Sequence, residues 1–239
     1  YFGALIGRYG WRQAYLILGV VSFLVLAVCG LLAERPVRTG VASLALSRIL
    51  RTREFLTLYV SILLTSFGLF TMFVFLVPFA ESKGINPYAA ASLLAVVGIF
   101  STVGRLALGP IADRFGRLRT LQLAILGMAV SYPIWLAEPN YPGLAVFAAI
   151  IGAAYGGWVA ISPSVLAEMF GTEGLGGTAG ALYTSAGIGA LLGPPLAGLI
   201  VDATGDYRPA IAGAMVLEVA ALAVIITLKP SLAGPSPQP

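Results

Sequence analysis

The sequence contains no histidine and only one cysteine, Cys29, among its 239 residues. Without histidine it lacks the side chain that most often acts as a general base or metal ligand near neutral pH. A single cysteine cannot form a disulfide within the chain, so cysteine usage leaves the redox compartment open. These absences argue against an enzyme, and we predict no cofactor and no metal site.

Charged residues are also scarce, at 10% of the sequence. A soluble domain carries roughly 25% charged residues, which keep its surface hydrated. Hydrophobic residues here reach 59%, and they fall in stretches of about twenty residues, the length that crosses the hydrocarbon of a bilayer. Because lipid offers backbone groups no hydrogen-bond partners, each stretch must satisfy its own, and barrel-like alternation is absent. The sequence therefore predicts an all-α transmembrane fold.

Basic residues indicate how the spans are oriented. We predict seven spans, over residues 12–33, 55–80, 88–109, 120–138, 143–168, 178–201 and 209–228, with residues 1–7 as the tail of a further helix. Nine Lys and Arg residues fall on one side of these spans and four on the other. The positive-inside rule places the basic side, and with it the C-terminus, in the cytoplasm. The net charge of +4 thus follows from topology, and we predict no nucleic-acid partner.

The longest connection on the basic side suggests a division of the chain. In residues 34–54, apolar Val41, Leu44 and Ile49 recur at near-helical spacing among arginines, a pattern that suits a helix lying on an anionic lipid surface. We predict four segments: the end of an N-terminal bundle (1–33), a cytoplasmic linker (34–54), a six-helix bundle (55–230) and a disordered tail (231–239).

A short internal repeat supports a larger parent protein. Gly10-Trp11-Arg12-Gln13-Ala14 and Asp206-Tyr207-Arg208-Pro209-Ala210 both follow a helix end and open a span. Their separation predicts a parent of about 400 residues built from two parallel halves. The chain also begins with Tyr1 in helix-like sequence, which indicates that it lacks most of its N-terminal half.

A charged motif follows the third complete span. It runs Gly109-Pro110-Ile111-Ala112-Asp113-Arg114-Phe115-Gly116-Arg117. Gly116 permits a tight turn, and Asp113 and Arg114 can pair across neighbouring helix ends. We therefore predict an interior loop in which Gly109, Asp113, Arg114, Gly116 and Arg117 act as a conformational latch. A basic loop that merely obeys topology is the alternative.

This motif resembles the signature loop of the major facilitator superfamily, in the copy between helices eight and nine. Gly10-Trp11-Arg12 resembles the start of helix six in the same superfamily, and residues 163–208 are similar to its monocarboxylate and oxalate–formate branch. The resemblance implies the C-terminal six-helix bundle of a major facilitator fold plus the last helix of the N-terminal half. It also implies secondary active transport by alternating access.

Arg105 is the leading candidate for substrate binding. It lies within a predicted span, where an arginine is costly unless it faces water or a partner. Its forked donors suit a carboxylate, although snorkelling or a local ion pair is an alternative. The resemblance implies the anion role, because monocarboxylate transporters carry an arginine at this point. They often carry an acid one turn earlier, where this sequence has Ser101.

Aromatic residues complete the predicted cavity, with helix packing as the alternative for each. They are Tyr59, Phe70, Tyr155, Trp158 and Tyr183. Glu218 lies in the last span and is a candidate for coupling to a proton or sodium ion. A protonated or helix-paired glutamate is the alternative that we favour.

The predicted function is transport of a small carboxylate across the membrane. The partners are then an organic anion, a proton or sodium ion, the bilayer and the missing N-terminal half. A drug or sugar carrier of the same superfamily is the main rival. A seven-helix receptor is a weaker one, because the last span has no lysine for a retinal and no cysteine pair ties the outer loops.

Overall fold

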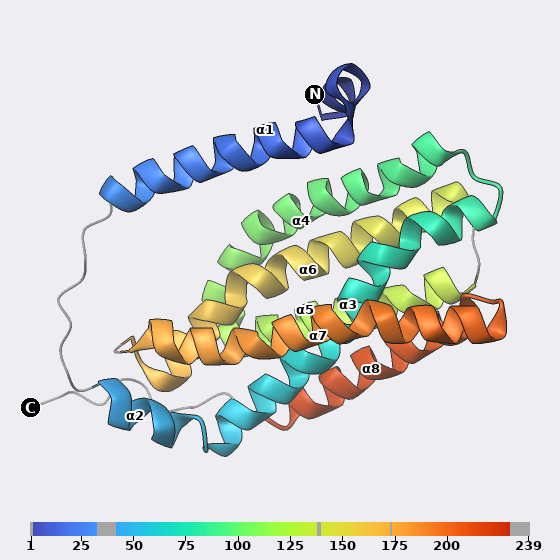
Figure 1. Ribbon diagram of the computed structural model, residues 1–239. Coiled ribbons are helices and arrows are strands. Elements are labelled where there is room, and N and C mark those ends of the chain that lie inside the picture. The colour runs from blue at the N-terminus through green and yellow to red at the C-terminus, as the bar shows by residue number, and fades with distance from the viewer. Residues whose placement is uncertain (1, 33–41, 138–139, 173, 230–239) are drawn as a thin grey trace, which may run out of the picture. The chain divides into compact units, whose positions relative to one another are not determined.

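The computed structural model describes residues 2–32, 42–137, 140–172 and 174–229, and the regular elements in these ranges are all helices (Figure 1). They are α1 (Phe2–Leu32), α2 (Ala42–Ile49), α3 (Arg53–Ser82), α4 (Pro87–Phe115), α5 (Arg117–Leu136), α6 (Tyr141–Phe170), α7 (Leu175–Thr204) and α8 (Arg208–Ile226). The prediction of an all-α fold is confirmed.

The chain divides into two compact units, Tyr1–Gly40 and Val41–Pro239. In the first unit, Gly10 interrupts α1 with a φ of 76° and a ψ of 160°, which are not helical. This interruption matches the predicted boundary between the tail at 1–7 and the span that starts at residue 12. The predicted linker residues 34–41 and the predicted tail at 231–239 lie outside the described residues.

Six helices are long and apolar enough to cross a membrane: α1 from Arg12 to Cys29, α3, α4, α6, α7 and α8. The prediction of a multi-pass membrane protein is therefore confirmed for six of the seven predicted spans. The remaining one, α5, has 20 residues, which is long enough to span. It is less apolar than the others, because Arg117, Arg119 and Gln122 lie near its start. That α5 crosses the membrane therefore remains a prediction.

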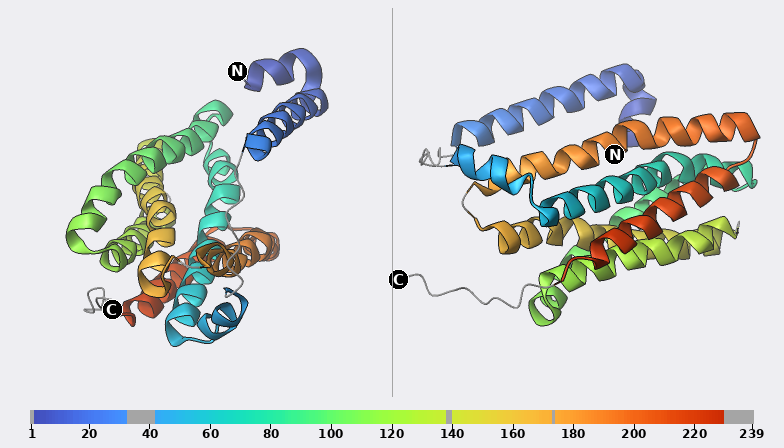
Figure 2. Two further views of the ribbon diagram at one scale, coloured as in Figure 1. Left: turned by 90° about the vertical axis from the view of Figure 1, so that its left-hand side faces the viewer. Right: turned by 90° about the horizontal axis from the view of Figure 1, so that it is seen from below.

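In the second unit, α3 packs between α7 and α8, while α6 packs between α4 and α5 (Figure 2). Contacts between α5 and α8 join the two groups. Trp135, Tyr132, Phe79 and Phe147 are among its largest fully buried side chains. The Trp135 and Phe147 ring centroids are 5.1 Å apart. This aromatic core gives the bundle a rigid interior against which surface residues are positioned.

Glycines bring α4 and α6 into close contact. A Cβ on Gly104 would overlap the backbone of Ala153, and a Cβ on Gly156 would overlap the backbone of Ser101. Such contacts are typical of membrane helices, where small residues allow backbones to approach. The orientation of α4, and therefore of Arg105, is fixed by these contacts.

A short helix, α2, forms within the predicted linker. It spans Ala42–Ile49 and packs against α7. Leu46 supplies part of this contact, with its Cδ2 3.4 Å from where a Cβ on Gly177 would lie. The expected helix is present, and its predicted position on the lipid surface stays a prediction.

Candidate functional site

Arg105 lies in the second half of α4 with its side chain exposed on the surface of the bundle. The helix that carries it is capped by Asn86, whose Oδ1 accepts a hydrogen bond of 2.9 Å from the Tyr88 amide. Its glycine contacts with α6 then hold it along the middle of the span. Within the described ranges Arg105 has no ion pair, so its guanidinium is available to a ligand or partner.

The exposed surface of α4 has two chemically different sides. One side carries large apolar residues: Ile99, Val103 and Leu106 are 63%, 49% and 74% exposed, as expected of side chains that contact acyl chains. The other side carries the Arg105 strip, which we define as Gly98, Thr102, Arg105 and Gly109, spaced so that they share one helix face.

The Arg105 strip is small and polar, and part of it is not packed within the bundle. A Cβ on Gly98 or Gly109 would meet no atom within 4 Å. The hydroxyl of Thr102 donates to the Gly98 carbonyl at 3.2 Å, which satisfies it within the helix. Because this strip differs from the apolar side of α4, its composition suits a surface that faces water or another helix and not acyl chains.

Three of the predicted aromatic residues lie in one row. The ring centroids of Phe70 and Phe73 are 6.3 Å apart, those of Phe73 and Tyr155 are 5.5 Å apart, and those of Tyr155 and Trp158 are 6.4 Å apart. Phe73 joins Phe70 of α3 to the predicted residues of α6, and it was not among the predicted site residues. Its position three residues after Phe70, on the same helix face, was the available signal.

The other two predicted aromatic residues lie where α3 meets α7. The hydroxyl of Tyr59 is 3.1 Å from the hydroxyl of Thr184, within hydrogen-bond distance. Tyr183 is the neighbour of Thr184 on α7 and is exposed. Among the described residues, no hydrogen bond or ring contact joins Arg105 to this pair or to the aromatic row.

The predicted latch requires a correction in its local structure. The sequence predicts an interior loop from Gly109, but α4 continues through Pro110 to Phe115. Buried Ala112, which is 6% exposed, keeps this last turn packed against the bundle, and membrane helices tolerate an internal proline. The turn itself is Gly116, whose φ of 90° and ψ of 142° favour glycine.

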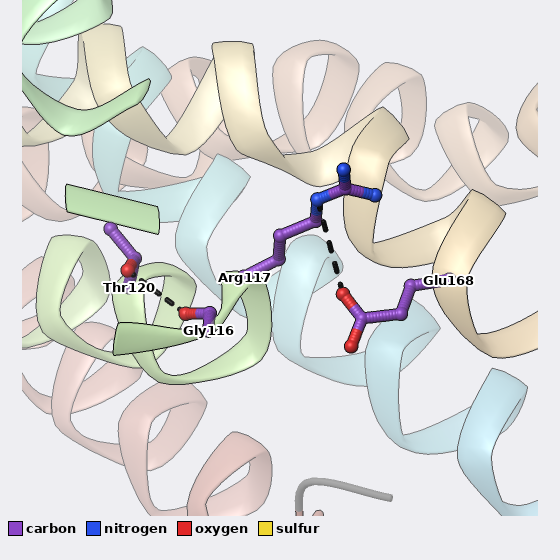
Figure 3. A network of polar contacts seen from close by, with 4 residues as sticks. All are labelled: Gly116, Arg117, Thr120 and Glu168. Atoms are coloured by element: carbon purple, nitrogen blue, oxygen red, sulfur yellow. Dashed lines mark hydrogen bonds and ion pairs between the residues drawn. The ribbon is translucent and has the colours of Figure 1, made fainter. Parts of the chain in front are cut away.

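One ion pair crosses from the latch to α6. The Nε of Arg117 is 4.0 Å from Oε2 of Glu168 (Figure 3). Beside it, the hydroxyl of Thr120 donates to the Gly116 carbonyl at 3.0 Å, which fixes the first turn of α5 (Figure 3). Glu168 was not among the predicted latch residues. Asp113 and Arg114 are exposed, and neither has an ion pair within the described ranges.

Glu218 lies apart from the Arg105 strip, in the interior between α3, α5 and α8. It is fully buried, and its Oε1 accepts a hydrogen bond of 3.3 Å from Thr65. Its Oε2 and the hydroxyl of Tyr132 both lie close to Gly68, 3.3 and 3.0 Å from where a Cβ would stand. Glu218 therefore pairs α8 with α3 through Thr65. Its coupling role stays a prediction.

The described residues therefore form a multi-pass helical membrane protein with an unpaired arginine on a small, polar helix face. No three His, Cys, Asp or Glu side chains among them come together as metal ligands. A family model, the Major Facilitator Superfamily, matches residues 1–133 and 79–239. The chain belongs to this superfamily, and its membership supports the prediction of a carrier over an enzyme or a receptor.

Among curated proteins the chain is similar to monocarboxylate transporters. It is 34% identical to monocarboxylate transporter 13 of Bos taurus over 240 residues, which cover 95% of this chain and 55% of the relative. It is 30% identical to monocarboxylate transporter 11 of Homo sapiens, over 90% of this chain and 49% of the relative. For monocarboxylate transporter 12 of Rattus norvegicus, identity is 33% over 66% of this chain and 33% of the relative. The chain thus spans about half or less of these relatives.

Proposed function

We propose that this chain supplies the C-terminal half of a secondary active transporter that moves a small carboxylate across the membrane by alternating access. Superfamily membership and the names of the similar transporters support this proposal. The fraction of each relative that the chain covers supports a parent with a further N-terminal bundle.

The observation that carries the proposal is the position of Arg105. A guanidinium within a span is costly unless water, an anion or a partner compensates it. Arg105 has no such partner among the described residues, and it lies on the Arg105 strip and not on the apolar side of α4. A carboxylate that accepts two parallel hydrogen bonds from this side chain would supply the missing compensation.

The remaining predicted residues take supporting roles in this proposal. The row formed by Phe70, Tyr155 and Trp158 would line an apolar wall for the organic part of the substrate. Tyr59 and Tyr183 would lie nearer the end of α3 that follows the linker. A proton or sodium ion would drive transport, and Glu218 is the candidate to bind it.

The latch would control one end of the carrier. Arg117 and Glu168 are 43% and 51% exposed, and exposed ion pairs contribute only about 0–1 kcal/mol. A pair of that strength can break and reform as two bundles rock against each other. By the positive-inside rule this end faces the cytoplasm, and the plasma membrane is the proposed location.

Uptake by the full-length protein tests the proposal. Labelled lactate, pyruvate, acetate and formate would be offered to cells that express the wild type, Arg105→Lys or Arg105→Ala. Since a hydrogen bond to a charged group is worth about 1.5–3 kcal/mol, we expect Arg105→Ala to lower carboxylate uptake about 10- to 100-fold. Arg105→Lys should retain part of it, because it keeps the charge but loses the bidentate geometry.

Arg119→Ala is the matched control, because Arg119 is also exposed but lies in the first turn of α5, outside the proposed site. It should leave uptake unchanged when expression is equal. Carboxylate uptake that is equal in wild type and both Arg105 variants would contradict the anion role. Uptake of a sugar or drug in place of every carboxylate would favour the rival carrier class.

A further inference from the structure

A groove lies where the second unit passes from α2 into α3. It has a volume of about 380 Å³ and is lined by Arg51, Arg53, Leu56, Thr57, Val60 and Val224. Its two arginines lie at the start of α3, and Val60 lies about 10 Å further along the helix at 1.5 Å per residue. The groove is therefore charged at one end and mainly apolar along the rest.

The turn that carries the two arginines is held by hydrogen bonds. Thr52, which lies between them, donates from its hydroxyl to the Ile49 carbonyl at 2.7 Å and accepts from the Phe55 amide at 3.2 Å. The Arg51 amide also donates to the Arg48 carbonyl, at 3.3 Å. Arg51 and Arg53 thus flank a capped helix start, where the helix dipole favours an anion.

Neither arginine is neutralised by a side chain that the structure describes. Within the described ranges, Arg51 and Arg53 have no ion pair. The nearest acid in sequence, Glu54, lies about 100° around the helix axis from Arg53 and does not line the groove. Leu56 and Val60 are 50% and 40% exposed, so the apolar wall is uncovered as well.

We propose that this groove binds one anionic phospholipid of the surrounding bilayer. Its phosphate would accept hydrogen bonds from Arg51 and Arg53, whose planar donors suit phosphate oxygens. One acyl chain would lie along Leu56, Val60 and Val224, so that a single molecule would contact both the charged and the apolar part of the groove. The groove lies between α3 and α8, whereas Tyr59, the proposed substrate-site residue nearest to it on α3, contacts Thr184 of α7. The lipid site is therefore on another side of α3 from the proposed substrate site.

Two comparisons favour a lipid over a free anion. A free phosphate would contact only the arginines and would use none of the apolar residues Leu56, Val60 and Val224 that also line the groove. A second cavity, of about 410 Å³ between α3, α7 and α8, has an apolar lining with no charged residue. That cavity offers nothing to hold a headgroup, whereas the groove at Arg51 and Arg53 combines both features of a phospholipid site.

Native mass spectrometry of the full-length protein tests this site. The protein would be released from mixed micelles that contain phosphatidylglycerol and phosphatidylcholine, and the lipids retained on it would be counted. We expect one retained phosphatidylglycerol per chain. Since each basic residue near a membrane surface is worth about 1 kcal/mol for anionic lipid, R51Q/R53Q should weaken this binding about 30-fold. R51K/R53K, which keeps the charge, should retain most of it.

One further pair of variants separates a lipid from a free anion. V60W would fill the apolar wall and should weaken lipid binding while inorganic phosphate binding stays unchanged. Its matched control is V219W, at an exposed valine of α8 outside the groove. R119Q is the control for the loss of a basic residue elsewhere. A variant would be compared with the wild type only if its thermal unfolding midpoint in detergent matches that of the wild type.

The outcomes are distinct. Lipid retention that survives R51Q/R53Q would overturn the site, and so would an equal loss in R119Q. Unchanged lipid binding in V60W would show that the apolar wall takes no part in binding, and would overturn the proposal of a phospholipid site. Equal retention of phosphatidylcholine and phosphatidylglycerol would overturn the role of the arginines.

Discussion

The hydroxyl of Thr65 on α3 donates a hydrogen bond of 3.3 Å to the carboxyl of Glu218 on α8, in the fully buried interior of the second unit. Ser61, one turn earlier, donates to the Ala221 carbonyl at 3.1 Å. From α5, the side-chain amide of Gln122 donates to the Ile225 and Leu228 carbonyls at 3.0 and 3.2 Å. Polar side chains therefore hold α8 against α3 and α5.

Glu218→Ala should destabilise the second unit. The substitution leaves Thr65 without its partner and opens space in a packed interior, which together should cost about 1–3 kcal/mol. Glu218→Gln keeps the size and an acceptor oxygen, so its loss should be below about 1 kcal/mol. Denaturant titration in detergent micelles measures both, and Val219→Ala on the exposed side of α8 is the control.

Glu218→Gln also separates the two possible roles of Glu218, helix pairing and binding of the coupling ion. If Glu218 only pairs helices, Glu218→Gln should retain uptake driven by a proton or sodium gradient. If it binds the coupling ion, this variant should lose gradient-driven accumulation but keep the exchange of substrate across a membrane without a gradient. Measuring accumulation and exchange in the same liposomes distinguishes the two.

Gly68→Ala should also destabilise the unit, because a Cβ would stand 3.0 Å from the Tyr132 hydroxyl and 3.2 Å from the Ala214 carbonyl. Overpacking of this kind costs about 1–3 kcal/mol. Gly213→Ala on α8 is the matched control, since its Cβ would meet no atom within 4 Å. Thermal unfolding midpoints of the two variants would then differ, and equal midpoints would contradict the close packing at Gly68.

Gly116→Ala should strain the turn between α4 and α5. Its φ of 90° and ψ of 142° lie near a region occupied almost only by glycine, where another residue costs about 1–3 kcal/mol. Gly109→Ala is the control within the same motif, because Gly109 is helical and its Cβ would meet no atom within 4 Å. If Gly109→Ala lowers the free energy of unfolding as much as Gly116→Ala does, the turn is not the cause.

The ion pair of Arg117 and Glu168 should contribute little to stability. Both side chains are close to half exposed and 4.0 Å apart, so a double-mutant cycle with Arg117→Gln and Glu168→Gln should give a coupling below about 1 kcal/mol. As a latch, however, the pair should alter how the carrier divides its time between its two open states. Accessibility of single cysteines at each end of the bundle would detect that change, and unchanged accessibility would argue against a latch.

Much of the fold could be predicted from the sequence, because an apolar chain in lipid can satisfy its backbone hydrogen bonds in only a few folds. The stretches around residues 55–80 and 143–168 had to become helices once their backbones left water. The predicted end at residue 109 was six residues too early, since Pro110 stops a helix in water more often than in a membrane bundle. Only Gly116, which can adopt a positive φ, ends α4.

The contacts of the candidate site could not be predicted in the same way. Thr65 and Glu218 are 153 positions apart, and Tyr59 and Thr184 are 125 apart. No local pattern links such pairs, because hydropathy records whether a segment leaves water but not which helix faces which. Glu168 was missed for this reason, since it pairs with Arg117 from another helix. Phe73 was different, because its spacing from Phe70 was a local signal.

The sequence by itself determined that the chain crosses a membrane as helices and that Arg105 lies within one of them, because transfer of backbone and charge into hydrocarbon depends on composition. Tertiary structure alone decided the surroundings of each polar side chain. It put Glu218 among α3, α5 and α8, and it left Arg105 on a small, polar face of α4. Close packing of glycines such as Gly104 and Gly156 fixes the rotation of each helix, and that rotation determines which side chains are buried and which remain exposed.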